Sequence, residues 1–133
     1  MAWSPLAGGL LTGKYQNGVP AMGRIQPGNG WADRHFTPAA MEAVGALGQV
    51  AHEKGCTLSQ LALAWCLSKP GLTCAILGAR TPDHLIDQLG ALNIALTEED
   101  HQRIDRICAP GKTLVSYYYE DSSADFHPAQ YRW

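Results

Sequence analysis

A short apolar run, LTCAIL at residues 72–77, constrains the fold of this chain more than any other feature. Glycines bound the run on both sides, which is the form expected of a β-strand buried on both faces of a parallel sheet. Residues 1–3, which are apolar and directly precede a Ser-Pro turn, offer only the end of a second strand. Because a strand buried on both faces needs neighbours on both sides, we expect the chain to be a fragment of a larger α/β domain.

Four threonines mark the expected starts of helices. Each is followed by Pro at the first helical position or by a capping partner, and then by apolar residues at helical spacing. They are Thr37, Thr57, Thr81 and Thr97. The residues expected to face inward are Met41, Val44, Leu47 and Ala51 in the first helix, Leu58, Leu61, Ala62, Trp65 and Cys66 in the second, Leu85, Leu89 and Leu92 in the third, and Ile104, Ile107 and Cys108 in the fourth.

The segments between these elements complete one partial domain that spans residues 1–133. Residues 1–15 are expected to hold a strand end and a glycine-rich loop, and residues 16–36, which show no periodicity, a long loop. Residues 37–108 are expected to hold the helices and the buried strand. Residues 109–133 form an aromatic tail without periodicity.

The composition excludes several functional classes. Ten Lys and Arg against twelve Asp and Glu give a net charge of −2, so the chain lacks the basic surplus of a nucleic-acid binder. A helix-turn-helix in GCTLSQLALAWCLSKPG is disfavoured, because its second helix carries only Lys69 near its end and no residues to contact bases along an exposed face. Without a charged, apolar leader or a run long enough to cross a bilayer, we expect a soluble cytoplasmic chain that binds neither nucleic acid nor membrane.

The cysteines are widely spaced and form no C-x-x-C pair or closely spaced Cys/His set. They are Cys56, Cys66, Cys74 and Cys108. This pattern predicts no metal site and favours buried thiols in a reducing compartment.

The first candidate for phosphate binding is SPLAGGLLTGKY, residues 4–15. From Gly8 to Lys14 it follows the P-loop pattern, but Tyr15 stands where Ser or Thr would bind magnesium. Three interpretations are open: a damaged triphosphate site, a glycine-rich turn that only reverses the chain, and a different phosphate loop.

The second candidate is LGARTPDHLIDQL, residues 77–89, in which the buried strand leads through Gly78 and Arg80 into a helix start. Free backbone N–H groups, the positive end of the helix dipole and a guanidinium together suit a phosphate monoester. The alternative is a solvated surface arginine beside a plain helix cap at Thr81. Since each candidate loop follows a strand end, a parallel sheet would place both on one face.

The blocks MAWSPLAGGLLTGKY and GCTLSQLALAWCLSKPGLTCAILGARTPDHLIDQLGAL closely resemble the C-terminal part of the aldo-keto reductases, over residues 1 to about 108. The resemblance is closest to the branch that includes bacterial NADPH-dependent reductases and the potassium-channel β subunits, and the tail looks more like that of the bacterial enzymes. It implies an α/β fold: a C-terminal fragment of a (β/α)8 TIM barrel, from the end of strand seven through helix eight and the C-terminal tail. It also implies that NADP(H) binds without a Rossmann domain.

The resemblance further implies a set of cofactor-binding residues. Those that line the nicotinamide and pyrophosphate are Trp3, Ser4, Pro5, Leu6, Ala7 and Gly8. Lys14 is implied to reach a phosphate, and Arg24 to help clamp the cofactor. At the adenosine end the implied contacts are Gly78 for close backbone approach, Arg80 and His84 near the 2′-phosphate, and Asp87 and Gln88 towards the adenine. Many family members carry Lys-Ser at residues 78–79, so here the grip on the 2′-phosphate depends more on Arg80.

The implied activity is NADPH-dependent reduction of an aldehyde or ketone. The family's catalytic Asp, Tyr, Lys and His belong to the first half of the barrel, so no catalytic residue is assigned here and the chain alone is expected to be inactive. The resemblance equally allows a non-catalytic NADP-binding interaction module like the potassium-channel β subunits. The implied partner is a small carbonyl substrate, and homo-oligomerisation stays open.

Overall fold

The computed structural model describes residues 1–21, 23–26, 28, 32 and 35–115. Parts of the expected long loop, at residues 22, 27, 29–31 and 33–34, lie outside the described residues. Most of the expected aromatic tail, residues 116–133, also lies outside them.

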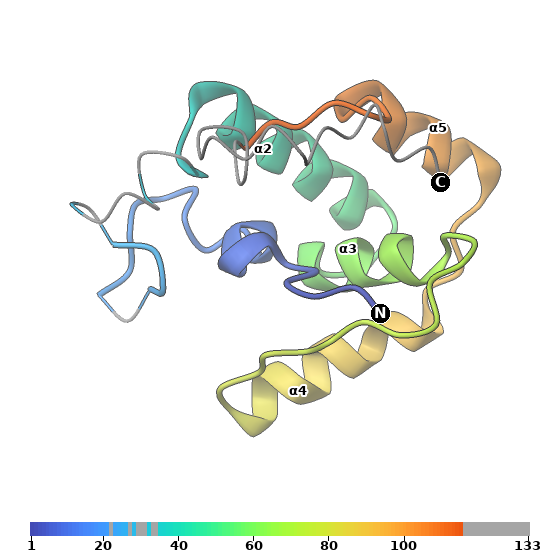
Figure 1. Ribbon diagram of the computed structural model, residues 1–133, viewed down its shortest axis with the longest axis horizontal. Coiled ribbons are helices and arrows are strands. Elements are labelled where there is room, and N and C mark those ends of the chain that lie inside the picture. The colour runs from blue at the N-terminus through green and yellow to red at the C-terminus, as the bar shows by residue number, and fades with distance from the viewer. Residues whose placement is uncertain (22, 27, 29–31, 33–34, 116–133) are drawn as a thin grey trace, which may run out of the picture.

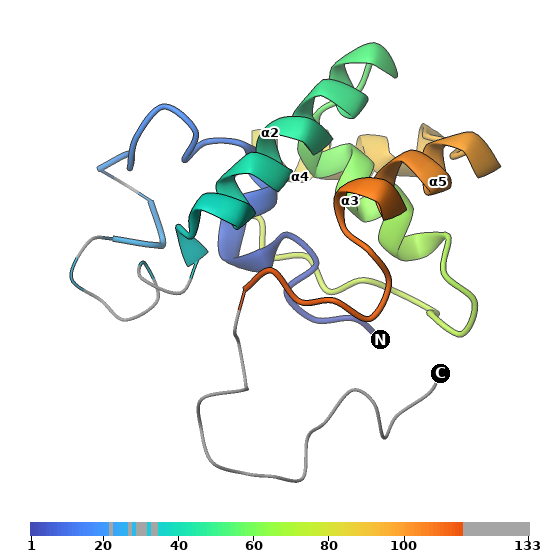
Figure 2. The ribbon, with the colours of Figure 1, turned by 90° about the horizontal axis from the view of Figure 1, so that it is seen from above.

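The described chain is built mainly of helices. In chain order the elements are the 3-10 helix η1 (Ala7–Thr12), the α-helices α2 (Pro38–Glu53), α3 (Leu58–Leu67) and α4 (Pro82–Leu89), the 3-10 helix η2 (Gly90–Asn93) and the α-helix α5 (Glu98–Ile107). Helix α3 lies in the middle, with α4 on one side and α2 and α5 on the other (Figure 1). Seen from above, α2 and α5 lie in front of α3, and α4 lies behind it (Figure 2).

The four helix starts expected from the threonines are confirmed. The side-chain oxygen of Thr37 accepts a hydrogen bond from the backbone N–H of Ala40, and that of Thr81 from the N–H of His84. Thr57 and Thr97 form complete capping boxes with their partners three residues later. These caps satisfy N–H groups that a helix start leaves without an intrahelical partner, which is why the sequence places the starts well.

The prediction of a β-strand at residues 72–77 is wrong, because the described residues form no regular strand there. One parallel bridge joins Ala2 to Ala75, in which the N–H of Ala2 donates to the carbonyl of Cys74 at 2.9 Å and the N–H of Ile76 donates to the carbonyl of Ala2 at 2.8 Å. The expected burial on both faces is also wrong, because Ile76 is 50% exposed. Hydrophobic pattern predicts which residues suit a sheet, but a strand forms only where neighbouring strands complete its hydrogen bonds.

The core lies between η1, α2, α3 and α5. Its buried residues include Leu10, Tyr15, Ile25, Ala40, Val44, Val50, Ala51, Leu58, Leu61 and Ile104. The expected inward face of α2 is confirmed, since Met41 and Leu47 also pack against this core. In α5 the expected Ile104 and Ile107 contribute to the core, whereas Cys108, at the end of the helix, is half-buried outside it.

The predicted stripe of α3 is confirmed only in part. Leu58 and Leu61 are buried and Trp65 packs against the core, whereas Ala62 and Cys66 are half-buried. The buried set also includes Leu63 and Ala64, which the predicted stripe omitted.

The expected inward face of α4 is wrong. Leu85, Leu89 and Leu92 are 42%, 47% and 72% exposed. Among the described elements, α4 packs on α3 and η2. The periodicity identifies an apolar side of the helix correctly, but it contains no information on which part of a protein covers that side.

Candidate cofactor site

The first loop, residues 4–9, has an unusual backbone. Ser4 and Ala7 have positive φ angles of 53° and 48°, and Gly8 and Gly9 follow with φ of 66° and 100°. Residues other than glycine adopt this left-handed conformation uncommonly, and it persists where surrounding contacts enforce it.

Three local hydrogen bonds hold this loop. The N–H of Ala7 donates to the carbonyl of Ser4 at 2.9 Å, and the N–H of Gly9 donates to the carbonyl of Leu6 at 2.9 Å. The N–H of Gly8 donates to the side-chain oxygen of Ser4 at 3.4 Å. The predicted residues Ser4, Leu6, Ala7 and Gly8 therefore belong to one tight turn, while Trp3 is exposed just before it.

Lys14 lies directly against this loop. A Cβ added to Gly9 would lie 3.2 Å from Lys14 Nζ and 3.3 Å from its Cε. The same ammonium lies 5.0 Å from the centre of the Tyr15 ring. The structure thus brings a cation to a glycine-rich turn, which suits an anionic ligand.

Tyr15 argues against the damaged P-loop. Its side chain is buried, its ring lies 5.1 Å from that of Phe36, and its hydroxyl accepts a hydrogen bond from the N–H of Ile25 at 3.0 Å. A P-loop requires at this position a hydroxyl directed at magnesium and a helix that starts there, whereas Tyr15 is a core residue after a 3-10 turn. The contact also anchors Ile25, and with it the neighbouring exposed Arg24.

The second loop runs from Gly78 into the start of α4. A Cβ added at Gly78 would meet no atom within 4 Å, so the backbone there is open to close approach. Arg80 and His84 are both exposed, one just before the cap residue Thr81 and the other in the first turn of α4. They therefore flank the helix end at which free N–H groups and the dipole favour an anion.

Asp87 and Gln88, predicted at the adenine, lie on the side of α4 that meets α3. The carboxylate of Asp87 accepts hydrogen bonds from Thr57 Oγ1 at 3.0 Å and from Gln60 Nε2 at 3.2 Å. Gln88 is buried and lines an apolar cavity of about 260 Å³, and its Oε1 has no hydrogen-bond partner among the residues that the structure describes. The role of Thr57 and Gln60 beside Asp87 was not predicted, because a capping-box pattern reveals the cap and not a second contact with a distant helix.

The two loops leave the parallel bridge in the same direction. Residues 1–3 and 74–76 run parallel, so residues 4–8 and 78–81 both follow the same end of the paired segments. This is the arrangement in which α/β proteins bind ligands, at the carboxyl ends of parallel strands.

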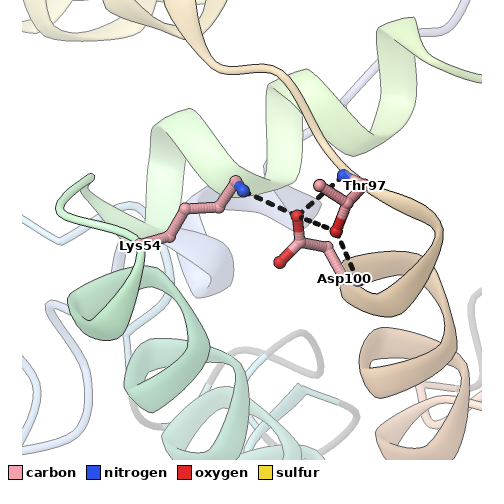
Figure 3. Close-up of polar contacts among 3 residues, drawn as sticks. All are labelled: Lys54, Thr97 and Asp100. Carbon is pink, nitrogen blue, oxygen red and sulfur yellow. Dashed lines mark hydrogen bonds and ion pairs between the residues drawn. The ribbon is translucent and has the colours of Figure 1, made fainter.

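An ion pair between Lys54 and Asp100 lies away from these loops. Lys54 Nζ, after the end of α2, lies 2.6 Å from Asp100 Oδ2 in the first turn of α5, and the same carboxylate oxygen accepts from the N–H and hydroxyl of Thr97 (Figure 3). The hydrogen bond from Lys54, followed by that from the Thr97 backbone, lowers the pKa of Asp100 from its ordinary 3.8 to about 2. This pair connects α2 to α5 and is structural.

No alternative chemistry is assembled among the described residues. They contain no group of three His, Cys, Asp or Glu side chains placed to hold a metal ion. The four cysteines are free and partly buried, and burial raises the pKa of Cys56, Cys66 and Cys108. Of the helices described, none is long and apolar enough to span a bilayer.

Comparison with known proteins identifies the family. Residues 1–109 match the Aldo/keto reductase family. One relative, from Oryza sativa subsp. japonica, is named "Probable voltage-gated potassium channel subunit beta" and is 37% identical over 110 residues. The match includes 79% of this chain and 34% of the relative, so the chain spans about a third of that protein's length. The chain belongs to the aldo/keto reductase family.

Proposed function

We propose that these residues form the NADP(H)-binding C-terminal part of an aldo-keto reductase that reduces aldehydes or ketones. The observation that carries the proposal is the parallel bridge between Ala2 and Ala75, since it directs two loops with anion-binding character to one side. Family membership supports a nicotinamide cofactor and a (β/α)8 barrel.

The loops fit the two ends of a dinucleotide phosphate. The turn at residues 4–8 and Lys14 would hold the nicotinamide and pyrophosphate, and the glycine-rich backbone leaves room for close approach. Arg80 and His84, at the start of α4, would hold the 2′-phosphate, which favours NADP(H) over NAD(H). When bound, NADPH would supply the hydride, and this chain's own residues would bind and orient the cofactor.

The second candidate is a non-catalytic NADP-binding interaction module. It is favoured by the 37% identity to a protein named as a potassium-channel β subunit. It would use the same two loops, so it differs from the enzyme in turnover rather than in cofactor binding. Membrane association that depends on a channel partner would support it.

We also propose a reducing, cytoplasmic location, on the basis of the four free thiols. We propose a small carbonyl compound as the partner in catalysis. Self-association is proposed on the basis of the exposed apolar residues of α4.

The test is a titration of the protein, expressed from its complete open reading frame, with NADPH and NADH, followed by carbonyl-dependent NADPH oxidation. Arg80→Ala should weaken NADPH by about 1.5–3 kcal/mol, the range for a hydrogen bond to a charged group, and NADH much less. Arg106→Ala, a change at an exposed arginine of α5, is the matched control. Equal losses of affinity for both cofactors would show that Arg80 does not contact the 2′-phosphate. NADPH binding without turnover of any carbonyl compound would favour the interaction module.

A further inference from the structure

A cluster of hydrogen bonds joins the start of α3 to the second half of α4. Gln60 Nε2 donates to the backbone carbonyl of Asp87 at 2.9 Å and to its carboxylate Oδ1 at 3.2 Å. Thr57 Oγ1 donates to the same Oδ1 at 3.0 Å. The amide of Gln60 is held in one orientation, because its Oε1 accepts the N–H of Thr57 at 3.1 Å.

Gly90 makes this approach possible. A Cβ added there would overlap Gln60 Nε2 and would lie 3.2 Å from Gln60 Cδ. The backbone of Gly90 is itself right-handed helical, with φ −56° and ψ −22°, so alanine fits its conformation without strain. The absence of a side chain at this position therefore serves the contact with Gln60 and not a turn.

Helix α3 also contacts the element that continues from the first loop. η1 packs on α3, and a Cβ added to Gly13, just after η1, would lie 3.8 Å from Leu58 Cδ2. Leu58 is the first residue of α3 and is buried. The start of α3 thus lies between the element that follows the first loop and the helix that follows the second.

The placement of α4 depends strongly on these polar contacts. Ile86 and Leu89 are 69% and 47% exposed, so much of the apolar surface of α4 adds little packing within the described residues. Three hydrogen bonds, two of them to a charged carboxylate, are then a large share of what orients the helix.

We propose that Thr57 and Gln60 are positioning residues that set the spacing between the two cofactor loops. The inference rests on the proposed function, because it assumes that one dinucleotide contacts both loops. Such a ligand behaves as two linked binding groups, and its affinity falls when the sites no longer match its span. A ligand that contacts the second loop alone is indifferent to that spacing.

Gln60→Glu tests the proposal in the protein expressed from its complete open reading frame. Glutamate keeps the capping box, since it accepts the Thr57 N–H equally well, but it donates nothing to Asp87 and places a second negative charge beside it. We expect NADPH to bind about tenfold more weakly, and ribose 2-phosphate, which lacks the adenine implied to contact Asp87, to bind within about twofold of the wild type. Unchanged NADPH affinity, or an equal loss for both ligands, would overturn the positioning role.

Gly90→Ala provides an independent variant. It should weaken NADPH about as much as Gln60→Glu in the wild-type background, and should add nothing in a Gln60→Ala background, where the overlapping side chain is gone. Gly48→Ala is the matched control, because a Cβ at that helical glycine meets nothing within 4 Å. Additive losses would overturn the inference, whereas failure of the wild-type protein to bind NADPH would overturn the proposed function with it.

Discussion

Replacing Lys54 with methionine removes the ammonium from the ion pair with Asp100 while keeping a side chain of similar length. Lys54 Nζ lies 2.6 Å from Asp100 Oδ2, and the side chains of Lys54 and Asp100 are 21% and 14% exposed. A carboxyl whose pKa falls from 3.8 to about 2 on folding gains roughly 2 kcal/mol of stability, at about 1.4 kcal/mol per pKa unit. Thr97 supplies part of this gain, so we expect Lys54→Met to lower the free energy of unfolding at pH 7 by about 1 kcal/mol.

The stability contributed by Asp100 depends on pH in a known direction. Because the folded pKa of Asp100 is lowered, its stabilisation is present above the unfolded pKa of 3.8 and is lost as the pH falls towards about 2. Urea unfolding between pH 7 and pH 2 should therefore show the wild type and Lys54→Met converging at the acid end. Arg103→Met, which removes the more exposed pair with Glu53, is the control and should change stability little. If the difference in unfolding free energy between the two proteins stayed constant across the pH range, Lys54 would not be the cause of the low pKa of Asp100.

Two further changes test the first loop and its support. Gly9→Ala should weaken NADPH binding and destabilise the loop, because φ at Gly9 is 100° and the added Cβ would lie 3.2 Å from Lys14 Nζ. Fluorescence titration measures the binding and thermal unfolding measures the stability. If neither quantity changes, the loop geometry described above is wrong. Tyr15→Phe should cost about 1–3 kcal/mol in urea unfolding, because the buried N–H of Ile25 loses its acceptor; a neutral result would mean that another acceptor replaces the hydroxyl.

The sequence predicts the helices because their determinants are local. Thr37 and Thr97 start helices through bonds to residues three positions on, and such contacts are visible in the sequence. A strand at residues 72–77 and the burial of Leu85 would both need packing partners distant in the chain, and the local pattern does not specify such partners. The apolar pattern therefore identified surfaces that would need a packing partner, but it did not show whether such a partner is present.

The candidate site divides in the same way. The glycines, Lys14 and Arg80 were predicted from their order in the chain and from resemblance. The left-handed backbone of Ser4 and the contact between Gln60 and Asp87 were not, because they arise from a turn geometry and from two helices brought together by folding.

The bridge between Ala2 and Ala75 also has a consequence for biosynthesis. η1, α2 and α3 lie between the two residues, and a ribosome that adds ~5–20 residues per second needs several seconds to produce that segment. Throughout that interval Ala2 lacks its bridge partner Ala75, and closing so long an intervening segment carries an entropic cost that shorter contacts avoid. Nascent chains arrested before Ala75 should therefore lack a completed pair of loops, and under the proposed function the capacity to capture a dinucleotide would appear only after Ala75 has left the ribosome rather than growing with chain length.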